Sequence, residues 1–283
     1  MAFPHELVRR IERFTVLDKV AKPVAGMVGR AVRPRLVRNV LSGTKLGHPA
    51  HPMLTDLPIG AWSMSALLDT VGGASAEPAA DLLVGAGILS AIPTAMTGLN
   101  DWSDTIGGET RVGVVHAGAN VAALGLYVAS LLARRGGRRG RGKLLGLAGL
   151  GVLMVGGYLG GHLSFAKAVN VNHTAFEDGP QEWTPVLADA ELGEGEHRRV
   201  SAGEAAVLLV RDQGRLYALA NTCSHAGGPL DEGELVDGCV VCPWHASTFR
   251  LTDGSIVRGP ASTPQPAYQS RVRDSKIEIR SLG

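Results

Sequence analysis

Long uncharged runs occupy the first half of the chain, whereas its end is built of shorter alternating runs. Three of the long runs carry no charged side chain over 18, 22 and 22 residues, at 82–99, 112–133 and 144–165. A helix of about 20 apolar residues can cross a hydrocarbon core of about 30 Å. The pattern therefore predicts three membrane-spanning helices.

Residues 53–68 form a fourth and weaker apolar segment, because Asp56 interrupts it and Asp69 ends it. We count it as a span as well. The fold expected for residues 48–168 is then an all-α, four-helix transmembrane bundle.

The preceding arm, residues 1–47, is basic, with ten Lys or Arg against three acidic residues. Leu7, Ile11 and Phe14 recur in it at helical spacing between arginines. This pattern favours an amphipathic helix lying on anionic lipid, but a solvated basic arm would have the same composition. Both interpretations stay open.

The end of the chain shows the alternation expected of β-strands. Apolar runs at 206–211 and 215–220 are joined by a three-residue turn, which predicts a β-hairpin. Residues 239–242 are predicted to form another strand. We expect an all-β domain over 183–283, joined to the helices by a linker at 169–182.

Charge and composition narrow the functional classes. Lys plus Arg total 28 and Asp plus Glu total 26, so the formal net charge is only +2 and no nucleic-acid partner is implied. The chemistry is concentrated instead in two Cys-His pairs, Cys223-Ser-His225 and Cys242-Pro-Trp-His245. Two thiolates and two imidazoles suit a mixed-ligand [2Fe–2S] cluster, and they also suit a tetrahedral zinc site. The spacing by itself leaves both open.

The residues around these pairs carry a family resemblance. The segments 223–229 (CSHAGGP), 242–247 (CPWHAS), 253–254 (DG) and 259–261 (GPA) resemble the cluster-binding loops and the Gly-Pro loop of Rieske proteins. The resemblance covers about the last hundred residues. It implies an all-β Rieske domain with a cluster-binding subdomain and one [2Fe–2S] cluster.

The resemblance also implies the roles of individual residues. Cys223 and Cys242 would bind the inner iron, and His225 and His245 would bind the outer iron, where electrons leave. Four further residues are expected around the cluster: Gly228, Ser247, Gly259 and Pro260.

The chain departs from the high-potential Rieske pattern at three positions. Gly228 and Trp244 stand where those proteins have a cysteine in each loop, and Phe249 stands where they have a tyrosine. Without the disulfide and the phenolic donor, we expect a potential in the lower Rieske range, about −150 mV to near zero. The remaining cysteine, Cys239, is expected to be a small buried core thiol.

The helical region carries its own, less informative resemblance. The motif His48-Pro-Ala-His51-Pro52, together with the four-helix pattern, resembles an uncharacterised bacterial family of small membrane proteins often found beside or fused to Rieske domains. That family brings no established activity. With four spans, His51, His116 and His162 would lie at one depth in the membrane. They would form a haem b or quinone site, or else hydrogen-bond between helices.

Two basic segments of the sequence give conflicting predictions of the membrane orientation. The positive-inside rule places both the basic arm and the basic segment 134–143 in the cytoplasm, yet three predicted spans separate them. Since [2Fe–2S] domains are assembled in the cytosol, we expect both termini on the cytoplasmic face of a bacterial inner membrane.

The expected function is therefore a membrane-anchored Rieske ferredoxin. It would carry single electrons between a donor and an acceptor, with a redox partner such as a reductase or an oxygenase and with the lipid bilayer as its second partner. Only 38 residues follow His245, so no mononuclear-iron domain of an oxygenase is expected there. Two alternatives remain: a quinone- or haem-linked membrane oxidoreductase, and a redox-sensing interaction module. Whether the protein is itself an enzyme stays open.

Overall fold

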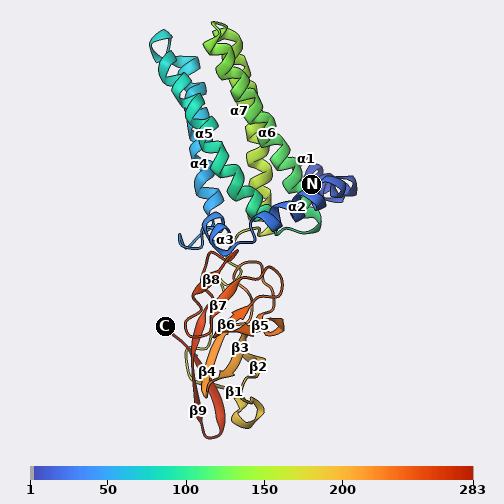
Figure 1. The fold of residues 1–283 in the computed structure, drawn as a ribbon, viewed down its shortest axis with the longest axis vertical. Coiled ribbons are helices and arrows are strands. Elements are labelled where there is room, and N and C mark those ends of the chain that lie inside the picture. Colours follow the sequence, from blue (N-terminus) through green and yellow to red (C-terminus); the bar gives the residue numbers. More distant parts are fainter. Residues whose placement is uncertain (1–2, 283) are drawn as a thin grey trace. The chain divides into compact units, whose positions relative to one another are not determined.

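The computed structural model describes residues 3–282, which divide into two compact units (Figure 1). One unit contains Met1–Arg33 and Ala50–Val169 and is helical. The other contains Pro34–Pro49 and Asn170–Gly283 and holds all the strands of the described residues. Part of the basic arm thus belongs to the β unit.

Four long helices form the centre of the helical unit. They are α4 (Ala50–Val71), α5 (Glu77–Trp102), α6 (Gly107–Arg135) and α7 (Arg139–Gly161), and α7 continues into a π-helical turn, His162–Ala166. Figure 1 shows α4 beside α5 and α6 beside α7, the two most extensive helix pairings. Each of the four predicted apolar segments lies within one of these helices or its direct continuation.

Length and composition qualify three of the helices as membrane spans within the described residues. They cover Ala74–Trp102, Gly107–Arg135 and Arg139–Ala166. Helix α4 does not qualify. It contains Asp56 and Asp69, so the prediction of a fourth span is not confirmed, although the helix itself is present.

Side chains from one helix enter notches left by glycine on the next. A Cβ atom added at Gly87 of α5 would lie 2.2 Å from Trp62 Nε1, and one at Gly149 of α7 would lie 3.0 Å from Tyr127. The two rings meet in the centre, stacked with their centroids 4.1 Å apart. Close helix packing is what small residues provide in membrane proteins.

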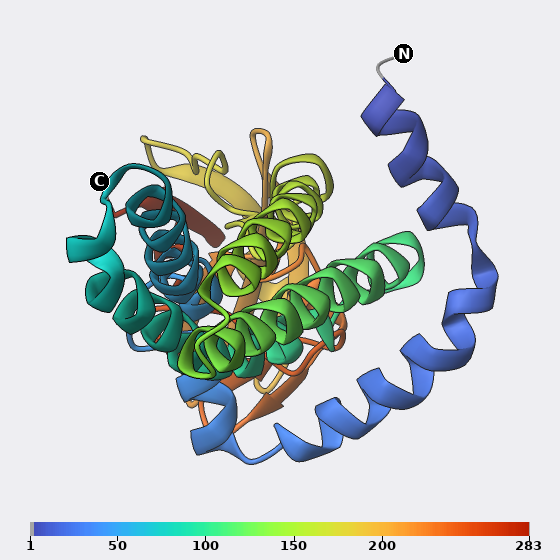
Figure 2. The same cartoon turned by 90° about the horizontal axis from the view of Figure 1, so that it is seen from above.

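The N-terminal arm is helical, with α1 (Phe3–Arg13), a 3₁₀ turn (Thr15–Leu17) and α2 (Asp18–Ala31). Figure 2 shows α1 and α2 as an arc outside the long helices. Val8 is 1% exposed against Val112 and Leu159, and Ile11 packs beside it, whereas Leu7 and Phe14 are exposed. The apolar face predicted for the arm is therefore divided between helix contacts and the surface.

The β unit contains two antiparallel sheets. The strands are β1 (Thr184–Ala188), β2 (His197–Ala202), β3 (Ala205–Asp212), β4 (Arg215–Ala220), β5 (Glu234–Val236), β6 (Cys239–Val241), β7 (Thr248–Arg250), β8 (Ile256–Arg258), β9 (Ala267–Arg273) and β10 (Lys276–Ser281). The larger sheet has the order β1-β10-β9-β4-β3-β2 and the smaller has β5-β6-β7-β8. The predicted hairpin is confirmed as β3–β4, in register through Asp212 and Arg215.

The core of the β unit places the candidate ligands. Leu208, Val210 and Leu219 of the larger sheet pack with Val240 and Phe249 of the smaller one. The sulfur-bearing residues Cys223 and Cys242 belong to the same apolar cluster. Both cluster loops are thus anchored to a rigid core.

Candidate metal centre

The two Cys-His pairs come together on two loops. Cys223 and His225 follow β4, and Cys242 and His245 lie between β6 and β7. The cysteines are 1% and 2% exposed, and the two imidazole rings stand edge to face with centroids 5.1 Å apart. The loops therefore gather all four predicted ligands, thiol beside thiol and imidazole beside imidazole.

Backbone N–H groups are directed at the two sulfurs. His225 and Ala226 donate to Cys223, and Trp244 and His245 donate to Cys242. The hydrogen bond from Cys223 lowers the pKa of Cys242 to about 7, while the same hydrogen bond and burial raise the pKa of Cys223. One thiol thus ionises readily, and a bound cation would stabilise the second thiolate.

The imidazole of His225 is held in the form that binds metal. Burial, together with the neighbouring His245, Arg38 and His173, lowers the pKa of His225 to about 3. The ring is therefore neutral at physiological pH, as a metal ligand must be.

The donor set fits a two-iron cluster. Within residues 3–282, no three His, Cys, Asp or Glu side chains are grouped closely enough to hold a single metal ion. A Rieske cluster requires only two protein ligands on each iron. The separate thiol and imidazole pairs meet that requirement.

Gln265 supports the first cluster loop and was not anticipated from the sequence. Its side chain is 2% exposed, and its Oε1 accepts the N–H of Ser224 at 3.0 Å. Its Nε2 donates to the carbonyls of Ala220 at 2.8 Å and Thr222 at 2.5 Å. A single glutamine between two prolines carries no sequence signal for this role, because its partners lie about 40 residues away.

The two positions that lack the disulfide cysteines face each other. A Cβ atom added at Gly228 would lie 3.0 Å from Cys242 Sγ and 3.0 Å from ring carbons of Trp244. The indole thus packs over the glycine. Nearby, the buried Ser247 accepts the N–H of Ala261 at its Oγ, at 3.0 Å.

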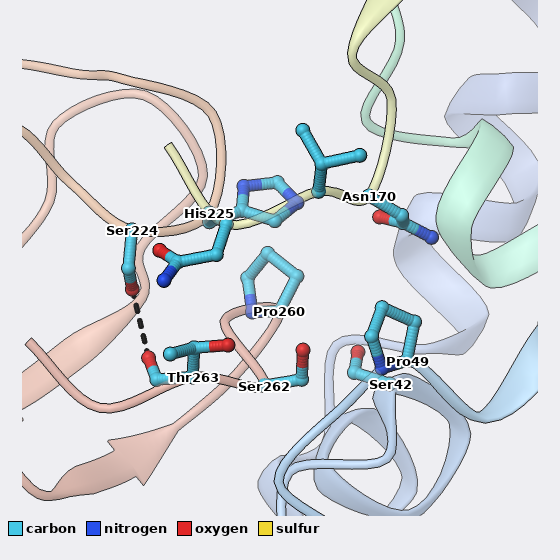
Figure 3. Close-up of a pocket in the computed structure, with 10 residues that line it drawn as sticks. Ser42, Pro49, Asn170, Ser224, His225, Pro260, Ser262 and Thr263 are labelled. Atoms are coloured by element: carbon cyan, nitrogen blue, oxygen red, sulfur yellow. Dashed lines mark hydrogen bonds between the residues drawn. The ribbon is translucent and has the colours of Figure 1, made fainter. Parts of the chain in front are cut away.

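The Gly-Pro loop meets the basic arm. The N–H of Gly259 donates to Asn39 Oδ1 at 2.8 Å, and Asn39 lies on α3 (Arg35–Ser42), which packs against β8. Figure 3 shows Pro260 and His225 in the wall of one pocket. The other lining residues are Ser42, Pro49, Asn170, Val171, Asn172, Ser224, Ser262 and Thr263.

The structure brings two of the three membrane histidines together. His51 and His116 have ring centroids 6.5 Å apart, and their Nδ1 atoms lie 3.0 Å from the Thr94 carbonyl and 2.8 Å from the Gly156 carbonyl. His162 instead lies 3.4 Å from Glu12. These are contacts between helices, and neither the geometry nor the comparisons below support haem or quinone.

Two family models match the chain. The family described as "Rieske [2Fe-2S] domain" matches residues 182–269, and the family described as "Predicted membrane protein (DUF2231)" matches residues 47–173. The suspected fusion is thereby confirmed.

Curated relatives match the C-terminal domain. The anthranilate 1,2-dioxygenase ferredoxin subunit of Burkholderia cepacia is 33% identical over 98 residues, covering 35% of this chain and 91% of that protein. The 3-phenylpropionate/cinnamic acid dioxygenase ferredoxin subunit of Shigella boydii is 35% identical, covering 32% and 85%. Apoptosis-inducing factor 3 of Mus musculus is 36% identical over 91 residues, but this chain spans only 15% of its length.

Among solved structures, the ferredoxin of carbazole 1,9a-dioxygenase from Nocardioides aromaticivorans is 27% identical. It covers 36% of this chain and 99% of its own, with a TM-score of 0.34. The curated ferredoxin subunits are matched over most of their length, and they show the family of the C-terminal domain. Through its C-terminal domain the chain belongs to the Rieske [2Fe–2S] ferredoxin family, and it carries this domain behind a predicted membrane domain of the DUF2231 family.

Proposed function

We propose that this protein is a membrane-anchored Rieske ferredoxin in which Cys223 and Cys242 bind the inner iron and His225 and His245 bind the outer iron. The observation that carries the proposal is the pairing of buried thiol with thiol and of imidazole with imidazole on two loops fixed to one core. When bound, the cluster supplies reversible one-electron chemistry.

The protein's own residues prepare the site for that charge change. The N–H groups of residues 225, 226, 244 and 245 point at the sulfurs, so their dipoles stabilise the negative charge that reduction adds. Phe249, fully buried in the position of the tyrosine, contributes no hydroxyl. The low Rieske potential predicted above rests on this comparison of donors.

The first experiment is electronic absorption and low-temperature EPR of the full-length protein in detergent, before and after dithionite. We expect the EPR signal of a reduced Rieske cluster at two irons per chain. Protein that contains one zinc per chain, or an all-cysteine cluster signal, would contradict the ligand assignment.

The curated relatives support a class of redox partner for this protein. The curated proteins that this chain covers almost completely are ferredoxin subunits of dioxygenases, so the acceptor proposed here is an oxygenase-type protein and the donor a reductase. Purified candidates should exchange electrons with the reduced cluster in stopped-flow mixing. Cluster oxidation no faster with the partner than without it would argue against that partner class.

The proposed location is a bacterial inner membrane with both termini in the cytoplasm and α4 as a fourth span. Part of the charge on the opposing basic segment is offset, since Arg134 pairs with Asp69 and Asp81, and Arg139 with Glu77 and Asp81. This leaves the basic arm as the stronger cytoplasmic signal.

Cysteine accessibility in intact cells tests this topology. Lys19→Cys in the arm and Ser75→Cys after α4 should react on opposite sides with a membrane-impermeant maleimide, with the unsubstituted chain as the background control. Labelling of both from the same side would show that α4 does not cross.

A further inference from the structure

Helix α3 lies far from the cluster loops in sequence yet belongs to the same compact unit. It is fixed there by specific hydrogen bonds. Arg35 Nε donates to the Val257 carbonyl at 2.9 Å, and Asn39 Nδ2 donates to the same carbonyl at 3.2 Å. With the Gly259 N–H donated to Asn39, the helix is tied to both β8 and the Gly-Pro loop.

The chain that follows α3 continues this contact. Thr44 Oγ1 donates to the Ala261 carbonyl at 3.1 Å. A Cβ atom added at Gly259 would lie 2.9 Å from that same Thr44 Oγ1, so only glycine allows so close an approach. Ser42 and Pro49 then share the pocket wall with His225 (Figure 3). The arm segment therefore forms part of the surroundings of the cluster.

This docking buries a positive charge. Arg38, in the middle of α3, is only 4% exposed, although arginine is rarely buried to this extent. Arg38 lies one helical turn before Ser42, which lines the same pocket as His225. A permanent cation is thus held within electrostatic range of the proposed outer-iron ligand.

Such a cation discriminates between the two redox states. Reduction adds one negative charge to the cluster, and a nearby buried cation stabilises that charge with little screening by salt. We propose that α3 is a part of the cluster site, and that its buried Arg38 raises the reduction potential above the value the Rieske domain would have without it. This inference rests on the proposed function.

The test is an EPR-monitored redox titration of full-length protein in detergent. Arg38→Gln should lower the ratio of reduced to oxidised cluster about tenfold at a fixed ambient potential. One nearby opposite charge changes the equilibrium constant of a charging reaction by about this factor. For one electron this is a shift of about 59 mV to lower potential. Arg38→Lys, which keeps the charge, should stay close to the unsubstituted protein.

The matched control is Lys45→Gln in the segment that follows α3, because Lys45 is exposed and its charge is screened by water. We expect little change in potential from it. Equal potentials for the unsubstituted protein and Arg38→Gln, with the Rieske signal intact in both, would overturn the inference. An unsubstituted protein without a Rieske signal would instead overturn the proposed function.

A second variant tests the same effect on the potential in case Arg38→Gln does not fold. Asn39→Ala leaves the charge in place but removes the hydrogen bonds to Val257 and Gly259. It should lower the potential in the same direction and increase tryptic cleavage at Arg35 and Arg38. Increased cleavage with an unchanged potential would also overturn the inference.

Discussion

The cluster loops and the helical unit both bury polar groups, but they partner them in opposite ways. In the loops, the polar partners are backbone N–H groups from the same short segment, aimed at the two sulfurs. In the helical unit, buried polar side chains reach neighbouring helices, as Ser65 of α4 donates to the Ala80 carbonyl of α5 and Ser130 of α6 to the Gly142 carbonyl of α7. The loops are arranged to receive a charged group, whereas the helices neutralise their own charges.

Arg134 illustrates the second arrangement. Its side chain is 1% exposed on α6, and it binds Asp69 at the end of α4 and Asp81 near the start of α5. Arg139 of α7 joins through Asp81 at 3.0 Å. One ion-pair network thus ties all four long helices together at one end.

The largest expected effect comes from removing a proposed ligand in the cluster loops. Cys242→Ser removes one of the two inner-iron ligands, so we expect complete loss of the Rieske signal and of bound iron. Cys239→Ser is the matched control, since that buried thiol lies outside the two Cys-His pairs and donates to the Asp237 carbonyl at 3.7 Å. Loss of the cluster in both variants would show that the cysteines act through folding.

The next largest effect comes from removing the buried ion pairs of the helical unit. Arg134→Met leaves Asp69 buried without its main counter-charge, so the helical unit should lose about 3–5 kcal/mol of stability. Thermal unfolding in detergent, followed by circular dichroism, measures the loss. Arg135→Gln, at the exposed neighbouring position, should change little. A comparable loss from both would mean that burial of the charge is not the cause.

Gln265→Leu tests how far the first loop depends on a side chain outside it. The variant loses all three hydrogen bonds of the amide, and the buried N–H of Ser224 is left without its acceptor, at a cost of about 1–3 kcal/mol. We expect faster release of iron to a chelator. The exposed Gln181→Leu serves as the control, and equal release rates would remove the role assigned to Gln265.

Gly228→Ala tests how closely Trp244 packs over Gly228, at the two positions where the disulfide cysteines are missing. The added methyl would press on the Trp244 ring and Cys242 Sγ, each 3.0 Å away, and overpacking of this kind costs about 1–3 kcal/mol. Trp244→Ala should relieve part of the strain in the double variant. If the single variant binds its cluster as firmly as the unsubstituted protein, the indole is not held against the glycine.

The smallest effect concerns the arm and depends on pH. Arg111 donates to both oxygens of Asp18 at 2.7 and 3.0 Å, and this hydrogen bonding holds the pKa of Asp18 below its usual range. Because the folded-state pKa is the lower one, the contribution is present above about pH 4 and disappears as the pH falls through the folded value. The protection of α2 amides against hydrogen exchange, relative to an unfolded chain at the same pH, should therefore fall in acid.

Asp18→Asn provides the matched control for that measurement. The variant should show the lower protection already at neutral pH, with no further loss of protection in acid. An acid response equal to that of the unsubstituted protein would assign the effect to another group.

The predictions that held were those carried by short segments. The hairpin of β3 and β4 and the three long apolar helices each follow from a pattern within one continuous segment. The fourth span failed to be confirmed for a local reason too, since Asp56 and Asp69 lower the apolar character of α4.

The sequence by itself determined which side chains could hold a metal group, because two Cys-His pairs lie in segments that resemble Rieske loops. It also determined the apolar helices, because their uncharged runs are long enough to cross a bilayer. Only the tertiary structure decided what surrounds the cluster. Asn39 meets Gly259 across 220 residues of chain, and Gln265 meets Ser224 across 41. Contacts at such separations leave no periodic pattern in the sequence, since they depend on how whole elements pack and not on the residues beside them.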